Sequence, residues 1–183
     1  MSIPDSAPHE PPGAGSRPSR STQVAAGVAM VLALAYALLK GYWALGGMAL
    51  RNTVSVAATS AIMENPWFLI LSLWGTVVLA LIAIAIPALL LRRGGTVVPR
   101  RMVLVPAWIG VAFLLARGVV GVIDSASLLW GEVTAMAGFS AAEVARFAWW
   151  DLLLYSPGFA LWGLALGVVA WRTRAAPAPR SFT

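Results

Sequence analysis

Four long runs of apolar residues limit the possible folds of this chain more than any other feature. They cover residues 23–45, 66–91, 102–123 and 143–171, and each is long enough to cross the roughly 30 Å hydrocarbon core of a bilayer as a helix. Of the 183 residues, 60% are hydrophobic and 11% are charged. The sequence therefore predicts an all-α fold, a four-transmembrane-helix bundle, in a multi-pass protein of the cell membrane.

The segments outside these runs define the domain organisation. Residues 1–21 are rich in Pro, Ser and Gly, so we expect a disordered N-terminal tail there. We expect a second disordered tail over residues 173–183, which leaves one four-helix membrane domain over residues 22–172.

The stretch between the third and fourth runs, residues 124–142, contains apolar residues at loose helical spacing. It predicts either a short amphipathic element at the membrane surface or an extension of the third helix. At its end, Ser140 and Glu143 have the spacing of a capping box, which predicts that the fourth helix begins there.

The basic residues gather on one side of the predicted bundle. Nine of the 13 precede the first run, separate the second from the third, or follow the fourth: Arg17, Arg20, Arg92, Arg93, Arg100, Arg101, Arg172, Arg174 and Arg180. By the positive-inside rule this side is cytoplasmic, so both termini are expected in the cytoplasm. The same distribution explains the net charge of +6 better than nucleic-acid binding does.

The residue types also exclude several kinds of site. The chain has no Cys, and its single His9 lies in the polar N-terminal tail, so we expect neither a disulfide framework nor a metal site. It has no nucleotide-binding loop, and we expect no cofactor. The partners we expect are membrane lipid or a lipophilic small molecule, with self-association or a membrane-protein partner as further alternatives.

Ionisable residues inside the runs are the candidate functional residues. Lys40 and Asp151 each lie about four residues, or ~6 Å, inside their helix ends, and Arg117 lies about six residues, or ~9 Å, inside its own. A charge that faces lipid at this depth costs roughly 1–3 kcal/mol, so pairing inside the bundle is favoured. We predict a polar cluster of Asp151 with Arg117 and Lys40, open to the outer leaflet. Tyr155 is expected on the face of Asp151, above a kink at Pro157.

Three blocks of sequence resemble a small bacterial integral-membrane family, domain of unknown function 3995. Residues 40–47 resemble its Tyr-Trp-Ala-Leu-Gly-Gly motif, with Lys40 in a region where the family has a His. Residues 146–157 resemble its Arg-Phe-Ala and Asp-x-x-x-Tyr-Ser-Pro block, and residues 117–121 loosely resemble its Arg-x-x-Gly element. The resemblance spans about residues 23–171, and it implies a four-helix membrane fold without an established activity.

The first functional hypothesis is a membrane-embedded enzyme, of the terpene cyclase or isomerase kind. Asp151 and Glu64 would be the acids, with Tyr155 beside them, because a carboxyl group in apolar surroundings holds a proton and aromatic faces stabilise cations. The reaction would be acid-initiated cyclisation or isomerisation of an isoprenoid-like substrate. Arg117 counts against this hypothesis, since a nearby cation keeps an acid ionised. The expected substrate-binding residues are Lys40, Tyr42, Trp43, Arg117, Asp124 and Trp150.

The alternative hypothesis is a non-catalytic protein that binds lipid, assists a partner membrane protein, or forms part of a pathway for a small solute. Asp151 would then neutralise Arg117 or Lys40 and fix the packing of the helices, and Tyr155 would be a packing residue. The sequence leaves these two classes of function open.

Overall fold

A computed structural model gives the fold of residues 18–47, 49–50, 53, 66–92, 99–131 and 139–174. The elements are α1 (Arg20–Ala44), α3 (Pro66–Leu91), α4 (Arg100–Trp130), and a fourth helix built from α5 (Ala141–Trp150), the π turn η2 (Asp151–Tyr155) and α6 (Ser156–Thr173). Four helices in this part of the chain are long and apolar enough to cross a membrane. The predicted all-α fold of four membrane-spanning helices is confirmed.

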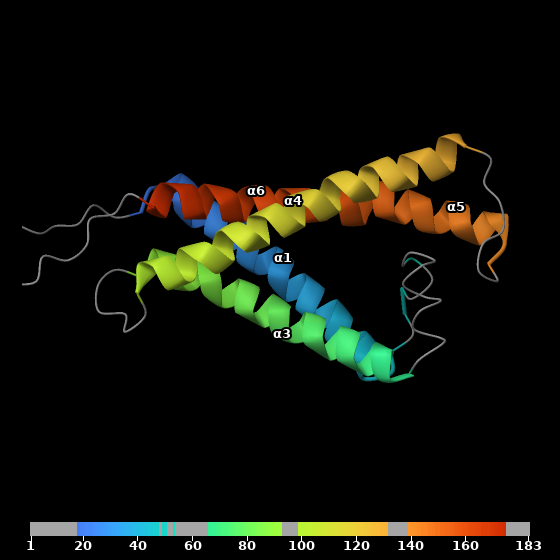
Figure 1. Cartoon of the computed structure of the whole chain (residues 1–183), viewed down its shortest axis with the longest axis horizontal. Coiled ribbons are helices and arrows are strands. Elements are labelled where there is room, and N and C mark those ends of the chain that lie inside the picture. Colours follow the sequence, from blue (N-terminus) through green and yellow to red (C-terminus); the bar gives the residue numbers. More distant parts are fainter. Residues whose placement is uncertain are drawn as a thin grey trace, which may run out of the picture.

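The helices form two pairs. α1 packs most extensively against α3, and α4 against α6, while α1 also contacts α6. Figure 1 shows that the pairs converge where α6 ends and α4 begins, and diverge toward α5 and the start of α3. Small residues on α1 allow close approach of the backbones in the converging half. The buried core of the bundle includes Ala26, Ala29, Ala33, Val111, Leu114, Leu166 and Val169.

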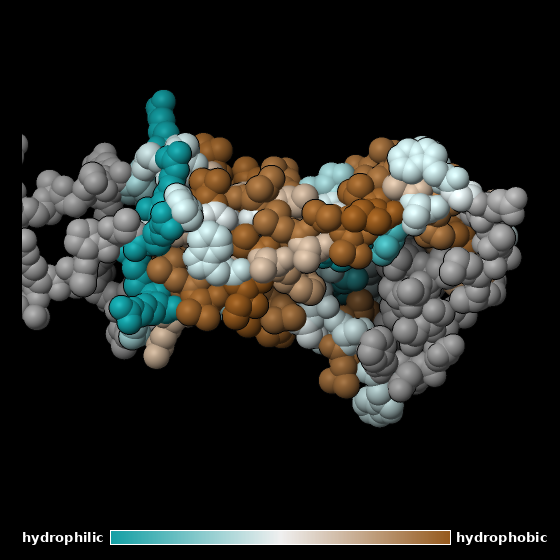
Figure 2. All heavy atoms as spheres, turned by 45° about the horizontal axis from the view of Figure 1, so that its top comes forward, coloured by the Kyte–Doolittle hydropathy of each residue, from teal (hydrophilic) through white to brown (hydrophobic). Residues whose placement is uncertain are grey.

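The outer surface of the bundle is apolar. Large aliphatic and aromatic side chains on all four helices are exposed, as expected for surfaces that face lipid. Figure 2 shows this apolar belt, bounded at one end by a hydrophilic band. We call that end the arginine end, because its described basic residues are Arg20, Arg92, Arg100, Arg101, Arg172 and Arg174.

Both ends of the described chain lie at the arginine end. The Nη1 of Arg172 donates to the hydroxyl oxygens of Ser19, at 3.0 Å, and Ser21, at 2.8 Å, so the start of α1 and the end of α6 are in contact. The cytoplasmic location of this end stays a prediction. The remainder of the two tails, residues 1–17 and 175–183, lies outside the described residues.

Helix α1 begins at Arg20, three residues before the predicted start at residue 23. The reason is a helix cap: the backbone N–H of Thr22 donates to both the carbonyl oxygen and the hydroxyl of Ser19. The third apolar run continues as α4 to Trp130. Residues 124–130 are therefore an extension of the third helix and not a separate element at the membrane surface.

The capping box at the start of the fourth helix is confirmed. The backbone N–H of Ser140 donates to Glu143 Oε2 at 2.9 Å, and the N–H of Glu143 donates to Ser140 Oγ at 3.4 Å. Further along, this helix changes to the π turn η2 just ahead of Pro157. There the N–H of Ser156 donates to the carbonyl of Asp151, five residues back, so the residue before the proline keeps its backbone bond.

Candidate functional site

The predicted pairing of Asp151 with Arg117 is confirmed. The Nη2 of Arg117, on α4, lies 2.7 Å from Oδ1 of Asp151, the first residue of η2. The side chain of Asp151 is only 11% exposed, whereas that of Arg117 is 35% exposed. The pair therefore joins α4 to the fourth helix, with the carboxylate in the interior and the guanidinium toward its edge.

Two serines that sequence analysis missed complete the surroundings of the carboxylate. Ser125 Oγ donates to Asp151 Oδ2 at 3.1 Å, and Ser156 Oγ donates to the same oxygen at 2.8 Å. Ser156 follows Asp151 by five positions, which an α-helix would place about 140° around its axis. The π turn instead brings these two side chains together, and no helical pattern in the sequence signals it.

Glycines on α4 make room for this ion pair. A Cβ on Gly121 would collide with Arg117 Nη1 and Ser156 Oγ, and would lie 2.8 Å from Asp151 Oδ2. A Cβ on Gly118 would lie 2.9 Å from the backbone nitrogen of Ala160, which leaves no room for a larger residue there. Close approach of α4 and the fourth helix thus depends on these two positions.

The prediction that Lys40 pairs with Asp151 is wrong. Among the described residues no carboxylate lies within 4.0 Å of the Lys40 ammonium. Its Nζ lies instead 5.4 Å from the ring centroid of Tyr36 and 4.8 Å from that of Trp43. The physical reason is the helix arrangement, because α1 packs against α3 and α6 whereas Asp151 is directed toward α4.

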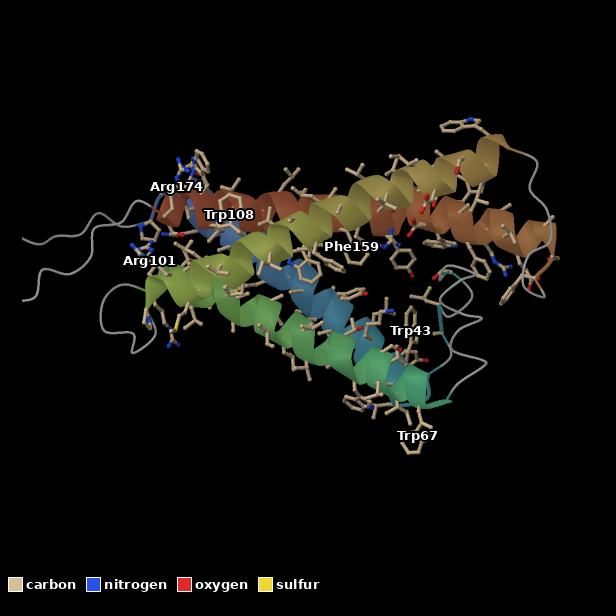
Figure 3. The ribbon with its side chains drawn as sticks, viewed as in Figure 1. Trp43, Trp67, Arg101, Trp108, Phe159 and Arg174 are labelled. Carbon is tan, nitrogen blue, oxygen red and sulfur yellow. The ribbon has the colours of Figure 1, made fainter. Side chains whose placement is uncertain are left out.

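Aromatic rings lie between the two cations. Tyr36 contacts Phe159 edge-on at 5.3 Å and Trp162 at 6.0 Å between ring centroids. The guanidinium carbon of Arg117 lies 5.3 Å from the Phe159 centroid, so each end of this aromatic group faces a cation. Figure 3 shows Phe159 and Trp43 directed into the space between the two helix pairs. We call Lys40, Arg117, Ser125, Asp151 and Ser156 the outer cluster.

The outer cluster lies near one boundary of the hydrocarbon core. At about 1.5 Å per residue, Arg117 lies ~26 Å along α4 from Arg100, and Lys40 lies ~30 Å along α1 from Arg20. The hydrocarbon core is itself about 30 Å thick. If the arginine end marks one boundary, the outer cluster marks the other, within reach of lipid head groups.

Tyr155 has a different partner from Asp151. Its hydroxyl lies 2.7 Å from Thr53 Oγ1. Because Thr53 Oγ1 donates its proton to the Leu50 carbonyl at 2.6 Å, Tyr155 is the donor in the first bond. Tyr155 thus joins the fourth helix to the segment after α1, a role that sequence analysis did not assign to it.

We expect Tyr155→Phe to lower the free energy of unfolding by about 1 kcal/mol, because the buried Thr53 hydroxyl loses a hydrogen-bond donor. Thr53→Val should have a similar effect, and the double variant should cost less than the two single variants added together. Unfolding in detergent micelles measures all three. Strictly additive losses would show that the two hydroxyls do not interact.

The region that contains these contacts matches a known family. A family model described as protein of unknown function, DUF3995, covers residues 32–166, which is more than half of the chain. The chain belongs to the DUF3995 family. No curated protein and no solved structure matches it. The family resemblance predicted from the sequence is therefore confirmed, and it assigns no activity.

In this DUF3995 protein, Tyr42 and Trp43 close the end of α1. Trp43 Nε1 donates to the Ala49 carbonyl at 2.8 Å, and the Tyr42 hydroxyl accepts from the Ala49 N–H at 3.3 Å. Gly46 has a φ of 93°, which favours glycine, and the Tyr42 ring occupies the place of a Gly47 side chain. The polar atoms of both predicted substrate-binding rings are thus used by the turn, although Trp43 still contacts Lys40.

The other predicted site residues lie apart from the outer cluster or beyond the described structure. Glu64 falls outside the described residues. Asp124 is exposed on α4, and no ion pair joins it to another residue that the structure describes. Trp150 is exposed at the end of α5. Within the described ranges, no group of three His, Cys, Asp or Glu could hold a metal ion.

Proposed function

We propose that this chain is a non-catalytic, lipid-binding protein of the cell membrane, whose outer cluster takes the anionic group of an amphiphile at Lys40. The observation that supports this function is the charge of the cluster. Asp151 pairs with Arg117, whereas Lys40 has no carboxylate within 4.0 Å among the described residues. One positive charge is left in a membrane-spanning helix, where a charge without a partner is costly and an anion would offset it.

The surroundings of Lys40 favour an amphiphile over a small ion. The ammonium lies against the faces of Tyr36 and Trp43, which attract it and limit its freedom to extend into water. Its position near the boundary of the hydrocarbon core suits a ligand whose anionic group lies at the head-group level. The alkyl or acyl chain of such a ligand would remain in the apolar belt. A phosphate or a carboxylate supplies the required charge.

The test uses purified protein in neutral detergent and a dansyl-labelled fatty acid, followed by energy transfer from tryptophan. We expect saturable binding, weakened about tenfold by Lys40→Gln, because a charge-assisted hydrogen bond contributes about 1.5–3 kcal/mol. Lys40→Arg should retain most of the affinity. The matched control is Arg146→Gln, since Arg146 is an exposed cation that also lies over a ring, that of Phe147.

A neutral probe separates charge recognition from partition into the micelle. The dansyl-labelled alcohol of the same chain length should bind wild type and Lys40→Gln equally and weakly. Equal binding of the acid and the alcohol, or a loss with Arg146→Gln as large as that with Lys40→Gln, would exclude the proposed role of Lys40.

Acid-initiated cyclisation or isomerisation of an isoprenoid-like substrate is less compatible with this geometry. That chemistry needs a carboxyl group that holds a proton until the substrate arrives. The two oxygens of Asp151 accept hydrogen bonds from Arg117, Ser125 and Ser156, an arrangement that suits the ionised, acceptor-only form. Incubation with linear and epoxidised isoprenoids should therefore give no product. Product formation that Asp151→Asn abolishes would establish the enzyme instead.

A further inference from the structure

The arginine end, opposite the outer cluster, carries positive charge that the described acids do not neutralise. Its six described arginines come from all four long helices, and Figure 3 labels two of them, Arg101 on α4 and Arg174 just after α6. The acidic residues that the structure describes are Asp124, Glu143 and Asp151, which lie toward the other end. The positive-inside rule explains why arginines gather at this end. It does not explain the contacts that surround two of them, Arg174 and Arg100.

Arg174 is held flat on an aromatic surface. Its guanidinium carbon lies 3.1 Å from the ring centroid of Trp171, and Trp171 meets Trp108 edge-on at 6.4 Å between centroids. Both rings remain accessible, with 54% of Trp171 and 40% of Trp108 exposed. A guanidinium stacked in this way keeps its N–H edge free for the planar, two-point contact that phosphate oxygens accept.

Arg100 provides a second, independent observation at the same end. Its Nε is buried and has no hydrogen-bond partner in the described structure. A buried cationic donor without an acceptor is costly, so an anion beside the Arg100 side chain would offset its charge. Arg172 differs from both residues, because Ser19 and Ser21 already accept from its Nη1.

We propose that an anionic phospholipid binds at the arginine end, with its phosphate held by Arg100 and Arg101 on α4 and by Arg174 after α6, and an acyl chain against Trp108 and Trp171. α4 packs against α6, and Trp108 contacts Trp171 near this end, which places these residues on neighbouring helices. Figure 2 shows that the apolar belt ends in a hydrophilic band at the arginine end, a position that suits contact with lipid phosphates. Trp108 lies ~10 Å farther along α4 than Arg101, within the reach of an acyl chain.

The experiment titrates the full-length protein in neutral detergent with phosphatidylglycerol or with phosphatidylcholine of the same chains, and counts bound lipid by native mass spectrometry. In the Lys40→Gln background, which lacks the other proposed lipid site, we expect saturable binding of one phosphatidylglycerol, at least fivefold tighter than phosphatidylcholine. Arg101→Gln and Arg174→Gln should each weaken it about fivefold, since a basic residue near an anionic surface contributes about 1 kcal/mol.

Arg172→Gln is the matched control, because it removes the same charge from the same end but from a residue whose Nη1 is already bonded. We expect its effect to be less than twofold. An equal loss of affinity with Arg172→Gln and Arg174→Gln would show that the basic surface as a whole attracts the lipid, and would overturn the proposed site. So would full displacement of the lipid by 10 mM inorganic phosphate, which would identify a free anion as the ligand. Circular dichroism verifies that each variant is folded, and the Lys40→Gln variant should bind phosphatidylglycerol here as wild type does.

Discussion

Replacing Asp151 by alanine will lower the free energy of unfolding by about 3 kcal/mol, the low end of the range for removing one partner of a buried ion pair. The variant leaves the Arg117 guanidinium and the hydroxyls of Ser125 and Ser156 without their acceptor. The low end applies because the side chain of Arg117 is 35% exposed and can recover some water contacts. Unfolding in detergent micelles, by heat or by denaturant, measures the loss.

The double variant Asp151→Ala with Arg117→Ala tests whether the loss comes from the pair. Once the cation is gone, no charge is left unpaired, so the combined loss should be smaller than the sum of the two single losses by at least ~1 kcal/mol. Asp124→Ala is the control, since it removes an exposed carboxylate from the same region of α4 and should change stability by less than about 0.5 kcal/mol. A double variant that is no better than additive would mean that the pair does not stabilise the bundle.

Gly121→Ala should destabilise the bundle by about 2–3 kcal/mol although it adds only one methyl group. The new Cβ would occupy the space that Arg117 Nη1 and Ser156 Oγ now fill, and would lie 2.8 Å from Asp151 Oδ2. The helices would have to separate or the ion pair would have to break. Either response weakens the contact between α4 and the fourth helix. The same unfolding measurement applies.

Gly110→Ala is the matched control for this change. It makes the same substitution on the same helix, but its Cβ would lie 3.4 Å from a Leu166 methyl group, an ordinary contact distance. We expect a change within about 1 kcal/mol, of either sign, because alanine also has the higher helix propensity. Equal losses at Gly110 and Gly121 would show that helix–helix packing in general, and not the ion pair, is disturbed.

Hydrophobicity and helix signals were sufficient to predict the fold. The apolar runs, the capping box at Ser140 and Glu143, and the arginines at the run ends led to four helices with boundaries that agree within a few residues, apart from the end of α4. The start of α1 differed because Ser19 caps the helix from within a segment whose composition indicates disorder. A helix cap depends on a single side chain, and the average composition of a segment does not reveal it.

The candidate site was predictable only in part. Depth along two helices was sufficient to predict the pair of Asp151 and Arg117, because charges at one level in a membrane favour each other. Depth does not say which way a helix faces, so the same argument wrongly included Lys40. The partners Ser125, Ser156 and Thr53 carry no charge, and their contacts depend on a π turn and on a loop that hydrophobic patterns do not describe.

The π turn also constrains how this protein can evolve. It places Ser156 one turn above Asp151 by using one residue more than an α-helical turn would use. Deleting a single residue between them would restore a regular α-helix and leave the residues on its two sides facing nearly as they do now, because the π turn already absorbs the extra residue. A deletion elsewhere in the fourth helix has no such turn to absorb it and would rotate the N-terminal side by about 100°, which would turn the buried Val144, Phe147 and Ala148 of α5 away from the core. Among relatives that keep the ion pair, a one-residue deletion should therefore be tolerated at the π turn and rare elsewhere in the fourth helix, whereas the connections beyond the helix ends are free to vary in length.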